Sequence, residues 1–184
     1  MACNLRPFRD YDEHDVINLF TLSGDMTNGV TKGHIVHVPT TGNGWMNTDE
    51  LQRLGAVGAS YSNTVSDRYG VNANVGPAYS GSTCLGMTLY DVKETDENGE
   101  KYIFNPRKAA ENDVVVSGQA VPVLTRGIVL YSGSQLTSDD PAAGTAVYSD
   151  DNGELTVTNG GGSVVGRTLG DVDSNNHVLV RINL

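Results

Sequence analysis

The sequence predicts a mostly β protein built from short antiparallel strands. Glycine is abundant, with 22 residues in a chain of 184, and such an excess indicates many tight turns. Strand-like runs recur at intervals of about 8–12 residues and are bounded by Gly, Asn and Asp. In the last run, HVLVRINL, alternate residues are apolar and share one face: Val178, Val180, Ile182 and Leu184. This pattern is typical of a compact β-barrel or a sandwich.

The first fifteen residues are predicted to form an extended N-terminal arm, followed by a β body over residues 16–184. The arm has mixed charges, and we expect it to gain order when it docks on a partner. Strand-like sequence begins at Val16 and continues, after a turn, through residues 30–38. Asn47 is followed three residues later by Glu50, which is a capping-box pattern. One short helix is therefore expected near residues 47–56.

Residues 59–84 are rich in Ser, Asn, Gly and Tyr, and they predict a long loop or irregular strands. Strand patterns resume at residues 85–92 and recur from residue 113 to the last residue. Asn98-Gly99 and Asn152-Gly153 predict two hairpin turns of type I′. Pro106 is expected to begin a turn or a single helical turn.

One short string occurs twice, as LGMTLYDV at residues 85–92 and as VGRTLGDV at residues 165–172. The copies share five positions: Gly86/Gly166, Thr88/Thr168, Leu89/Leu169, Asp91/Asp171 and Val92/Val172. A second echo, VTKGHIVHV and LTRGIVLY, aligns Thr31-Lys32-Gly33 with Thr125-Arg126-Gly127. The echoes keep the same order, so we expect an internal duplication with β units over residues 16–104 and 111–184. Neither copy contains a reactive group, and the repeat therefore indicates architecture rather than chemistry.

The charge balance excludes nucleic acid as a main partner. The formal net charge is −10, whereas a duplex-binding protein needs a basic surface that displaces counterions. No apolar run approaches the roughly 20 residues of a membrane span, and the first residues lack the apolar core of a secretion signal. We expect synthesis in a cytoplasm, with Cys3 and Cys84 as reduced thiols.

The reactive side chains form no recognisable catalytic, cofactor or metal motif. His34 and His37 are three residues apart, and on a strand they would point to opposite faces. The segment DVDSNN begins like a calcium loop but lacks the required Gly and Glu. No Gly-x-Ser-x-Gly elbow or phosphate loop is present in the sequence. We therefore predict that the protein is not an enzyme and has a binding or assembly role.

The C-terminal half resembles the capsid cement, or head decoration, proteins of tailed bacteriophages. Three stretches carry the resemblance: VVVSGQAVPVLTRGIVLYSG, DPAAGTAVYSDDNGELTVTNGGGSVVGRTL and the closing HVLVRINL. It implies a compact β-barrel or tulip-like β domain, often trimeric, on the outside of an icosahedral head. Such a virion protein would bind the major capsid protein, bridge its neighbouring subunits and stabilise the capsid against internal pressure.

Within this interpretation the arm supplies the candidate capsid contacts. They combine apolar and Arg anchors of the kind that dominate protein interfaces: Leu5, Arg6, Phe8, Arg9 and Tyr11. Two other functions stay open on the sequence. One is a structural component of a tail or fibre. The other is a carbohydrate-binding module, in which aromatic side chains would stack on sugar rings: Trp45, Tyr61, Tyr69 and Tyr79.

Overall fold

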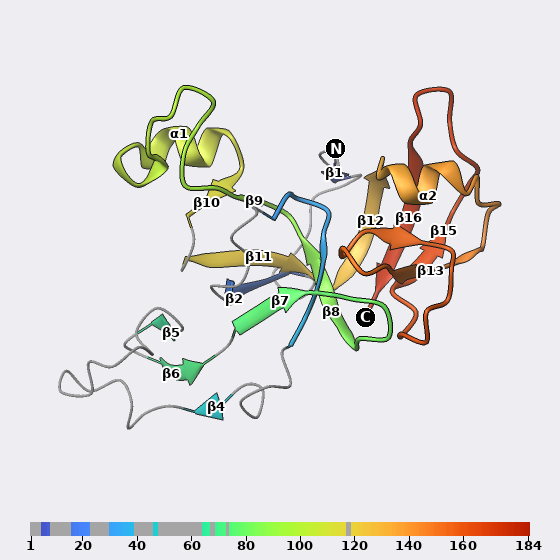
Figure 1. The fold of residues 1–184 in the computed structure, drawn as a ribbon, viewed down its shortest axis with the longest axis horizontal. Coiled ribbons are helices and arrows are strands. Elements are labelled where there is room, and N and C mark those ends of the chain that lie inside the picture. Colours follow the sequence, from blue (N-terminus) through green and yellow to red (C-terminus); the bar gives the residue numbers. More distant parts are fainter. Residues whose placement is uncertain are drawn as a thin grey trace.

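A computed structural model describes residues 5–7, 16–22, 30–38, 46–47, 64–66, 69–72, 74–116 and 119–184. The fold is mostly β, as predicted, and Figure 1 shows a barrel beside a second group of strands. The barrel is closed by five strands: β2 (Val16–Leu22), β3 (Ile35–His37), β7 (Asn74–Pro77), β8 (Cys84–Thr88) and β11 (Ala120–Leu124).

The second group is an antiparallel sheet of six strands in the order β1-β12-β16-β15-β13-β14. Its strands are β1 (Leu5–Pro7), β12 (Arg126–Tyr131), β13 (Ala146–Ser149), β14 (Leu155–Thr156), β15 (Gly166–Thr168) and β16 (Val178–Asn183). A short helix, α2 (Ser134–Ser138), follows β12 and buries Leu136. The N-terminal β1 joins this sheet beside β12, so the arm contributes a strand to the distant C-terminal half.

The barrel and the six-stranded sheet repeat one order and one register of strands. Thr88 of β8 lies opposite Val123 of β11, and Thr168 of β15 lies opposite Val180 of β16. In the barrel, β3 lies between β8 and β7. In the sheet, β13 lies in the same way between β15 and β14. The barrel order β2-β11-β8-β3-β7 therefore corresponds to the sheet order β12-β16-β15-β13-β14.

The repeated Gly-x-Thr string has the same role in both units. Each threonine hydroxyl donates to two backbone carbonyl oxygens that are three residues apart in the chain. The Thr88 hydroxyl donates to the carbonyls of Thr31 (3.1 Å) and His34 (3.3 Å). The Thr168 hydroxyl donates to those of Ala142 (2.7 Å) and Thr145 (3.4 Å). The turn that holds these carbonyls contains a glycine with positive φ, Gly33 (96°) or Gly144 (85°). Each of these glycines donates its N–H to the threonine carbonyl at 2.8 Å.

Two details of the predicted repeat are wrong. Residues 31–34 correspond to residues 142–145 and not to the segment around Thr125, because β12 takes the place of β2 rather than that of β3. The first unit also extends to Leu124 instead of ending at residue 104, since β11 borders β8 as β16 borders β15. The sequence comparison matched identical letters, whereas the corresponding strands share their order and their pairing partners.

The first unit carries two insertions that the second unit lacks. The insertion between β3 and β7 contains a three-stranded sheet of β4 (Met46–Asn47), β5 (Thr64–Ser66) and β6 (Tyr69–Asn72). Asn47 is thus a strand residue, and the rest of the helix predicted near residues 47–56 lies outside the described residues. The insertion between β8 and β11 contains β9 (Asp91–Val92), η2 (Tyr102–Phe104), α1 (Pro106–Glu111) and β10 (Val114–Val115).

Two strand pairs are parallel, although only antiparallel strands were predicted. β2 pairs with β7, and β9 pairs with β10, in parallel register. Parallel neighbours need a long crossover connection. Such connections exist here, because η2 and α1 join β9 to β10 and the strands of the first insertion separate β2 from β7.

The two Asn-Gly turns are not of type I′. Only the glycines have positive φ, 82° at Gly99 and 79° at Gly153, whereas a type I′ turn needs positive φ at both central residues. An aspartate three residues before each glycine accepts backbone N–H groups and sets the turn, as Asp96 does for Asn98 and Glu100 at 2.8 Å each. Asp150 does the same in the second turn.

One apolar core joins the two units. It contains Ile35, Met87 and Leu124 from the barrel strands together with Val129, Val147 and Val180 from the sheet, among others. A second cluster, which includes Val36, Val75 and Val121, fills the barrel interior. The barrel strands therefore bury both faces, one inside the barrel and one against the second unit, and leave the outward face of the sheet exposed.

Candidate docking face

Three neighbouring strands of the second unit alternate between buried and outward residues. In β12, Gly127, Val129 and Tyr131 are buried, and the residues between them face outward. In β16 the buried residues are Val178, Val180 and Ile182. The period of two residues therefore places every second side chain of these strands on one outward surface.

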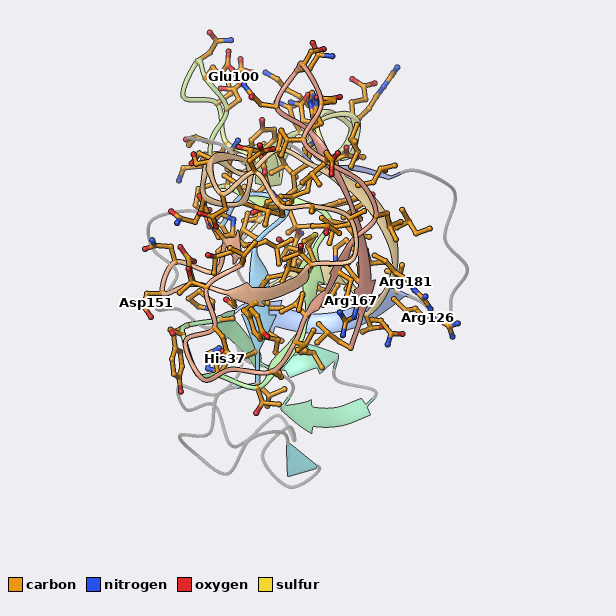
Figure 2. The ribbon with its side chains drawn as sticks, turned by 90° about the vertical axis from the view of Figure 1, so that its right-hand side faces the viewer. His37, Glu100, Arg126, Asp151, Arg167 and Arg181 are labelled. Atoms are coloured by element: carbon orange, nitrogen blue, oxygen red, sulfur yellow. The ribbon has the colours of Figure 1, made fainter. Side chains whose placement is uncertain are left out.

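Three arginines meet on this outward surface. Arg167 of β15 and Arg181 of β16 lie directly opposite each other in the register. Arg126 of β12 lies two residues from Ile128, the residue opposite Arg181, and is thus a diagonal neighbour of Arg181. Figure 2 shows the three arginines together on one side of the molecule, with Asp151 on the opposite side.

The arginines are exposed, and none forms an ion pair with a described residue. Arg167 Nη1 donates a hydrogen bond to the Gly144 carbonyl at 3.0 Å, which holds its side chain against the sheet. The acidic residues of this unit all lie outside its strands and helix: Asp139, Asp140, Asp150, Asp151, Glu154, Asp171 and Asp173. The outward surface of the sheet is therefore cationic, although the whole chain is strongly acidic.

Apolar side chains lie between the arginines. Leu169 is 46% exposed and Val164 is 42% exposed, while Ile128 is half-buried. Two hollows flank Arg181. Arg181 lines both of them. The first is also lined by Arg126, Gly127, Ile128 and Leu169. The second is also lined by Val164, Gly166, Arg167 and Asn183. We call this surface the arginine face, and it consists of Arg126, Ile128, Val164, Arg167, Leu169 and Arg181.

The predicted capsid contacts of the arm lie partly beside this face. Leu5 and Arg6 belong to β1, where Leu5 is opposite Tyr131 and Arg6 is opposite Leu130. Phe8, Arg9 and Tyr11 lie outside the described residues. The backbone of β1 thus extends the sheet whose outward surface is the arginine face.

The sequence analysis did not find the arginine face. Its signal is an arginine at an outward position of a strand, between buried neighbours, as in Gly166-Arg167-Thr168 and Val180-Arg181-Ile182. Each arginine is unremarkable by itself in the sequence. They form a cluster only through the pairing of β12, β16 and β15, which connects residues far apart in the chain.

The other residues considered in the sequence form no comparable site. His34 Nδ1 lies 2.8 Å from the Thr31 carbonyl oxygen, and the His37 ring contacts Tyr79 edge-on with centroids 5.1 Å apart. The described residues contain no group of three or more side chains that could hold a metal ion. Cys84 is buried, and this burial raises the pKa of its thiol.

The loop that begins like a calcium motif is a closed turn. Asp173 Oδ1 accepts the N–H groups of Asn175 and His177 at 2.8 Å each. These hydrogen bonds lower the pKa of the Asp173 carboxyl, and the bond from the His177 N–H has the largest effect. The carboxylate is thus used to shape the turn between β15 and β16.

No family model, curated protein or solved structure matches this chain. Over the described ranges, no helix has the length and apolarity that a membrane crossing requires.

Proposed function

We propose that this protein is a virion structural protein that binds the outer surface of an icosahedral phage head and cements adjacent major capsid protein subunits. The observation that carries the proposal is the arginine face, an exposed surface whose strands carry no acidic residue, beside the strand formed by the N-terminal arm. The resemblance of the C-terminal sequence to capsid cement proteins supports the same role.

The composition of the arginine face is that of a protein interface. Arginine is enriched at interfaces and acidic residues are depleted there. Here three arginines alternate with Ile128, Val164 and Leu169, and no acidic residue lies on the strands that carry them. The net charge of −10 suits a body that faces solvent, away from packaged DNA.

The arm offers a second means of attachment. Among the described strands, β1 pairs with β12 alone and is therefore an edge of the sheet. An edge strand presents unpaired backbone groups that a strand of a partner can bind. Contact through β1 and through the adjacent arginine face would hold one capsid subunit at the sheet while the rest of the body reaches a neighbour.

The direct test is co-sedimentation of the purified protein with expanded, empty phage heads. The expected result is that the intact protein pellets with the heads, whereas a variant that lacks residues 2–12 stays in the supernatant and keeps its β circular dichroism spectrum. Failure of the intact protein to pellet would contradict a head-binding role. Labelling of tails instead of heads in the same particles would favour a tail or fibre component.

Oligomeric state is a separate part of the proposal. We expect self-association, with a trimer as the form implied by the resemblance, and light scattering coupled to size exclusion measures it. A glycan array probed with the intact protein tests the carbohydrate-binding alternative. Of its four candidate aromatic residues, Tyr79 is the one whose side chain is described, and it is 49% exposed. Binding to a defined glycan would replace our proposal by that alternative.

A further inference from the structure

We infer that the arginine face binds the carboxylate groups of an acidic, extended segment of a partner protein. This inference rests on the proposed function, because the partner segment would belong to the capsid surface. It goes further by naming the chemistry of the partner and the residues that recognise it.

The cations of the face are all arginine. Residues 126–184 contain Arg126, Arg167 and Arg181 and no lysine, whereas the four lysines of the chain all lie in the first unit. A guanidinium presents a planar fork of N–H donors that matches a carboxylate through two parallel hydrogen bonds. A lysine supplies a similar charge but only a point contact. Consistent use of arginine indicates recognition of a planar anion rather than a general positive potential.

The two hollows provide places for such anions. The first lies between Arg126 and Arg181, and the second lies between Arg167 and Arg181. Leu169 borders the first and Val164 borders the second, so each hollow is lined by two arginines and an exposed aliphatic residue. An acidic side chain fills both requirements, because its carboxylate meets the arginines and its methylene groups meet the aliphatic residue.

The positive charges of Arg167 and Arg181 would be stabilised by a bound anion. Arg167 and Arg181 are directly opposite on neighbouring strands, and like charges at this position repel each other. No described acidic residue pairs with either. A carboxylate from a partner would lie between the two guanidinium groups and replace repulsion by two attractive contacts.

A protein partner agrees better with the face than a nucleic acid does. Nucleic acid binding uses a basic surface that follows many phosphates. Here only three lysine or arginine cations are present in residues 126–184, within a chain of net charge −10. Three cations are enough to bind a short acidic segment that carries only a few carboxylates.

The first experiment measures binding of a fluorescein-labelled oligoglutamate peptide by anisotropy, with labelled oligothymidine as the competing chemistry. We expect the intact protein to bind the peptide, with an affinity that falls as salt rises. The triple variant Arg126→Glu/Arg167→Glu/Arg181→Glu should lose at least tenfold in affinity. The triple Arg→Lys variant should lose severalfold, because it keeps the charge and removes the fork.

A matched control makes the same charge change elsewhere. Lys93, Lys101 and Arg107 are exposed cations of the first unit, and their triple replacement by Glu should leave peptide affinity within twofold of the intact protein. The inference is overturned if the arginine-face variant binds the peptide as the intact protein does. Equal loss in the control variant, or tighter binding of oligothymidine than of the peptide, would overturn it as well.

Co-sedimentation with heads separates this inference from the proposed function. If the intact protein binds heads and the arginine-face Glu variant binds them equally well, the inference fails and the head-binding role stands. If the intact protein binds the acidic peptide but not heads, the carboxylate site stands and the head-binding role fails. Thermal melting of each variant verifies that it is folded before binding is measured.

Discussion

Arg167 and Arg181 show how one pair of residues can favour binding at the expense of stability. They lie opposite each other on antiparallel strands, where side chains of neighbouring strands interact most directly. Both are exposed, so water and salt weaken their repulsion but do not remove it. The pair therefore costs the free protein a little stability, and a bound carboxylate would offset that cost.

Replacement of Arg181 by Thr should raise the free energy of unfolding by about 0.5 kcal/mol at low salt, because it removes the like-charge contact and introduces a residue that strands favour. Urea denaturation at low and high salt measures the effect, and the gain should shrink at high salt. Arg126→Thr is the control, since Arg126 lies opposite Asn183 and not opposite a cation. An equal gain in both variants would contradict an effect of the Arg167–Arg181 pair.

Asp173 gives a pH dependence whose sign follows from its hydrogen bonds. Two backbone N–H groups bind its charged form and lower the pKa of the carboxyl below the ordinary aspartate value of 3.8. A lowered folded-state pKa contributes stability above the unfolded-state pKa, and that contribution is lost as the pH falls through the folded-state value. The turn between β15 and β16 should therefore lose support in acid.

The pKa of the Asp173 carboxyl, measured by NMR titration, should lie below 3.8. Asp173→Asn should flatten the fall in stability of the protein between about pH 4 and pH 2, because the amide does not titrate. Asp171→Asn serves as the neighbouring control. A measured pKa at or above the ordinary value would show that the two N–H groups do not favour the charged form.

At the scale of strands, two glycines allow neighbouring chains to approach closely. A Cβ atom added to Gly86 would lie 2.6 Å from the Leu124 carbonyl oxygen, and one added to Gly166 would lie 2.1 Å from the Arg181 carbonyl oxygen. These are corresponding positions of the two units, since β8 borders β11 as β15 borders β16. The glycine of the repeated string thus serves the packing of one strand pair in each unit.

Gly86→Ala and Gly166→Ala should each destabilise the protein by about 3 kcal/mol, because backbone atoms of the neighbouring strand must move. Gly170→Ala is the matched control, since a Cβ there would meet nothing within 4 Å, and its effect should stay within about 0.5 kcal/mol. Urea denaturation of the three variants measures these differences. Similar stability of Gly166→Ala and Gly170→Ala would contradict the close approach.

The sequence predicted strands better than it predicted their pairing. Alternation in HVLVRINL located β16 and the buried residues Val178, Val180 and Ile182, because the period of two is a local property. Leu184, predicted on the same face, lies after the strand and is 38% exposed. The Gly-x-Thr string, also a local pattern, located both copies of the repeat. The counterpart of residues 31–34 in the second unit, residues 142–145, was missed. The two segments correspond through their hydrogen bonds to Thr88 and Thr168 and not through shared residue types.

The candidate site was predictable only in part. Leu5 and Arg6 were singled out in the arm, and the structure places their backbone in an edge strand of the sheet. The arginine face depends on which strands become neighbours, and no local pattern contains that information. A search for arginines at outward strand positions would have named Arg167 and Arg181 as candidates, but would not have shown them to be opposite each other.

For the molecule as a whole, the decisive feature is the core between the two units. Leu124 is fully buried at the end of the first unit and packs in the same cluster as Val129 and Val180 of the second. The sheet has no other described apolar layer on its inner face. We therefore expect the two units to unfold together rather than one after the other.

Leu124→Ala should lower the free energy of unfolding by about 3 kcal/mol, because it opens a cavity in this shared core. Calorimetry should still show one transition at a lower temperature, and amide exchange should accelerate for Val36 and Val180 alike. Ile103→Ala is the control, since Ile103 is 61% exposed and its removal should change stability by less than about 0.5 kcal/mol. Two separate transitions would contradict a common core.

The insertions of the first unit have a practical consequence for the second. Where the first unit has long excursions after β3 and after β8, the second has short turns after β13 and after β15. The turn after β13 is fixed to the barrel, because the Ile35 N–H donates to the Gly153 carbonyl at 2.7 Å. The turn at residues 173–177 forms no hydrogen bond to the described residues of the barrel, so it is the better position for grafting a foreign peptide. If the protein does coat a particle, copies carrying such a graft would present it as an ordered, repeated array.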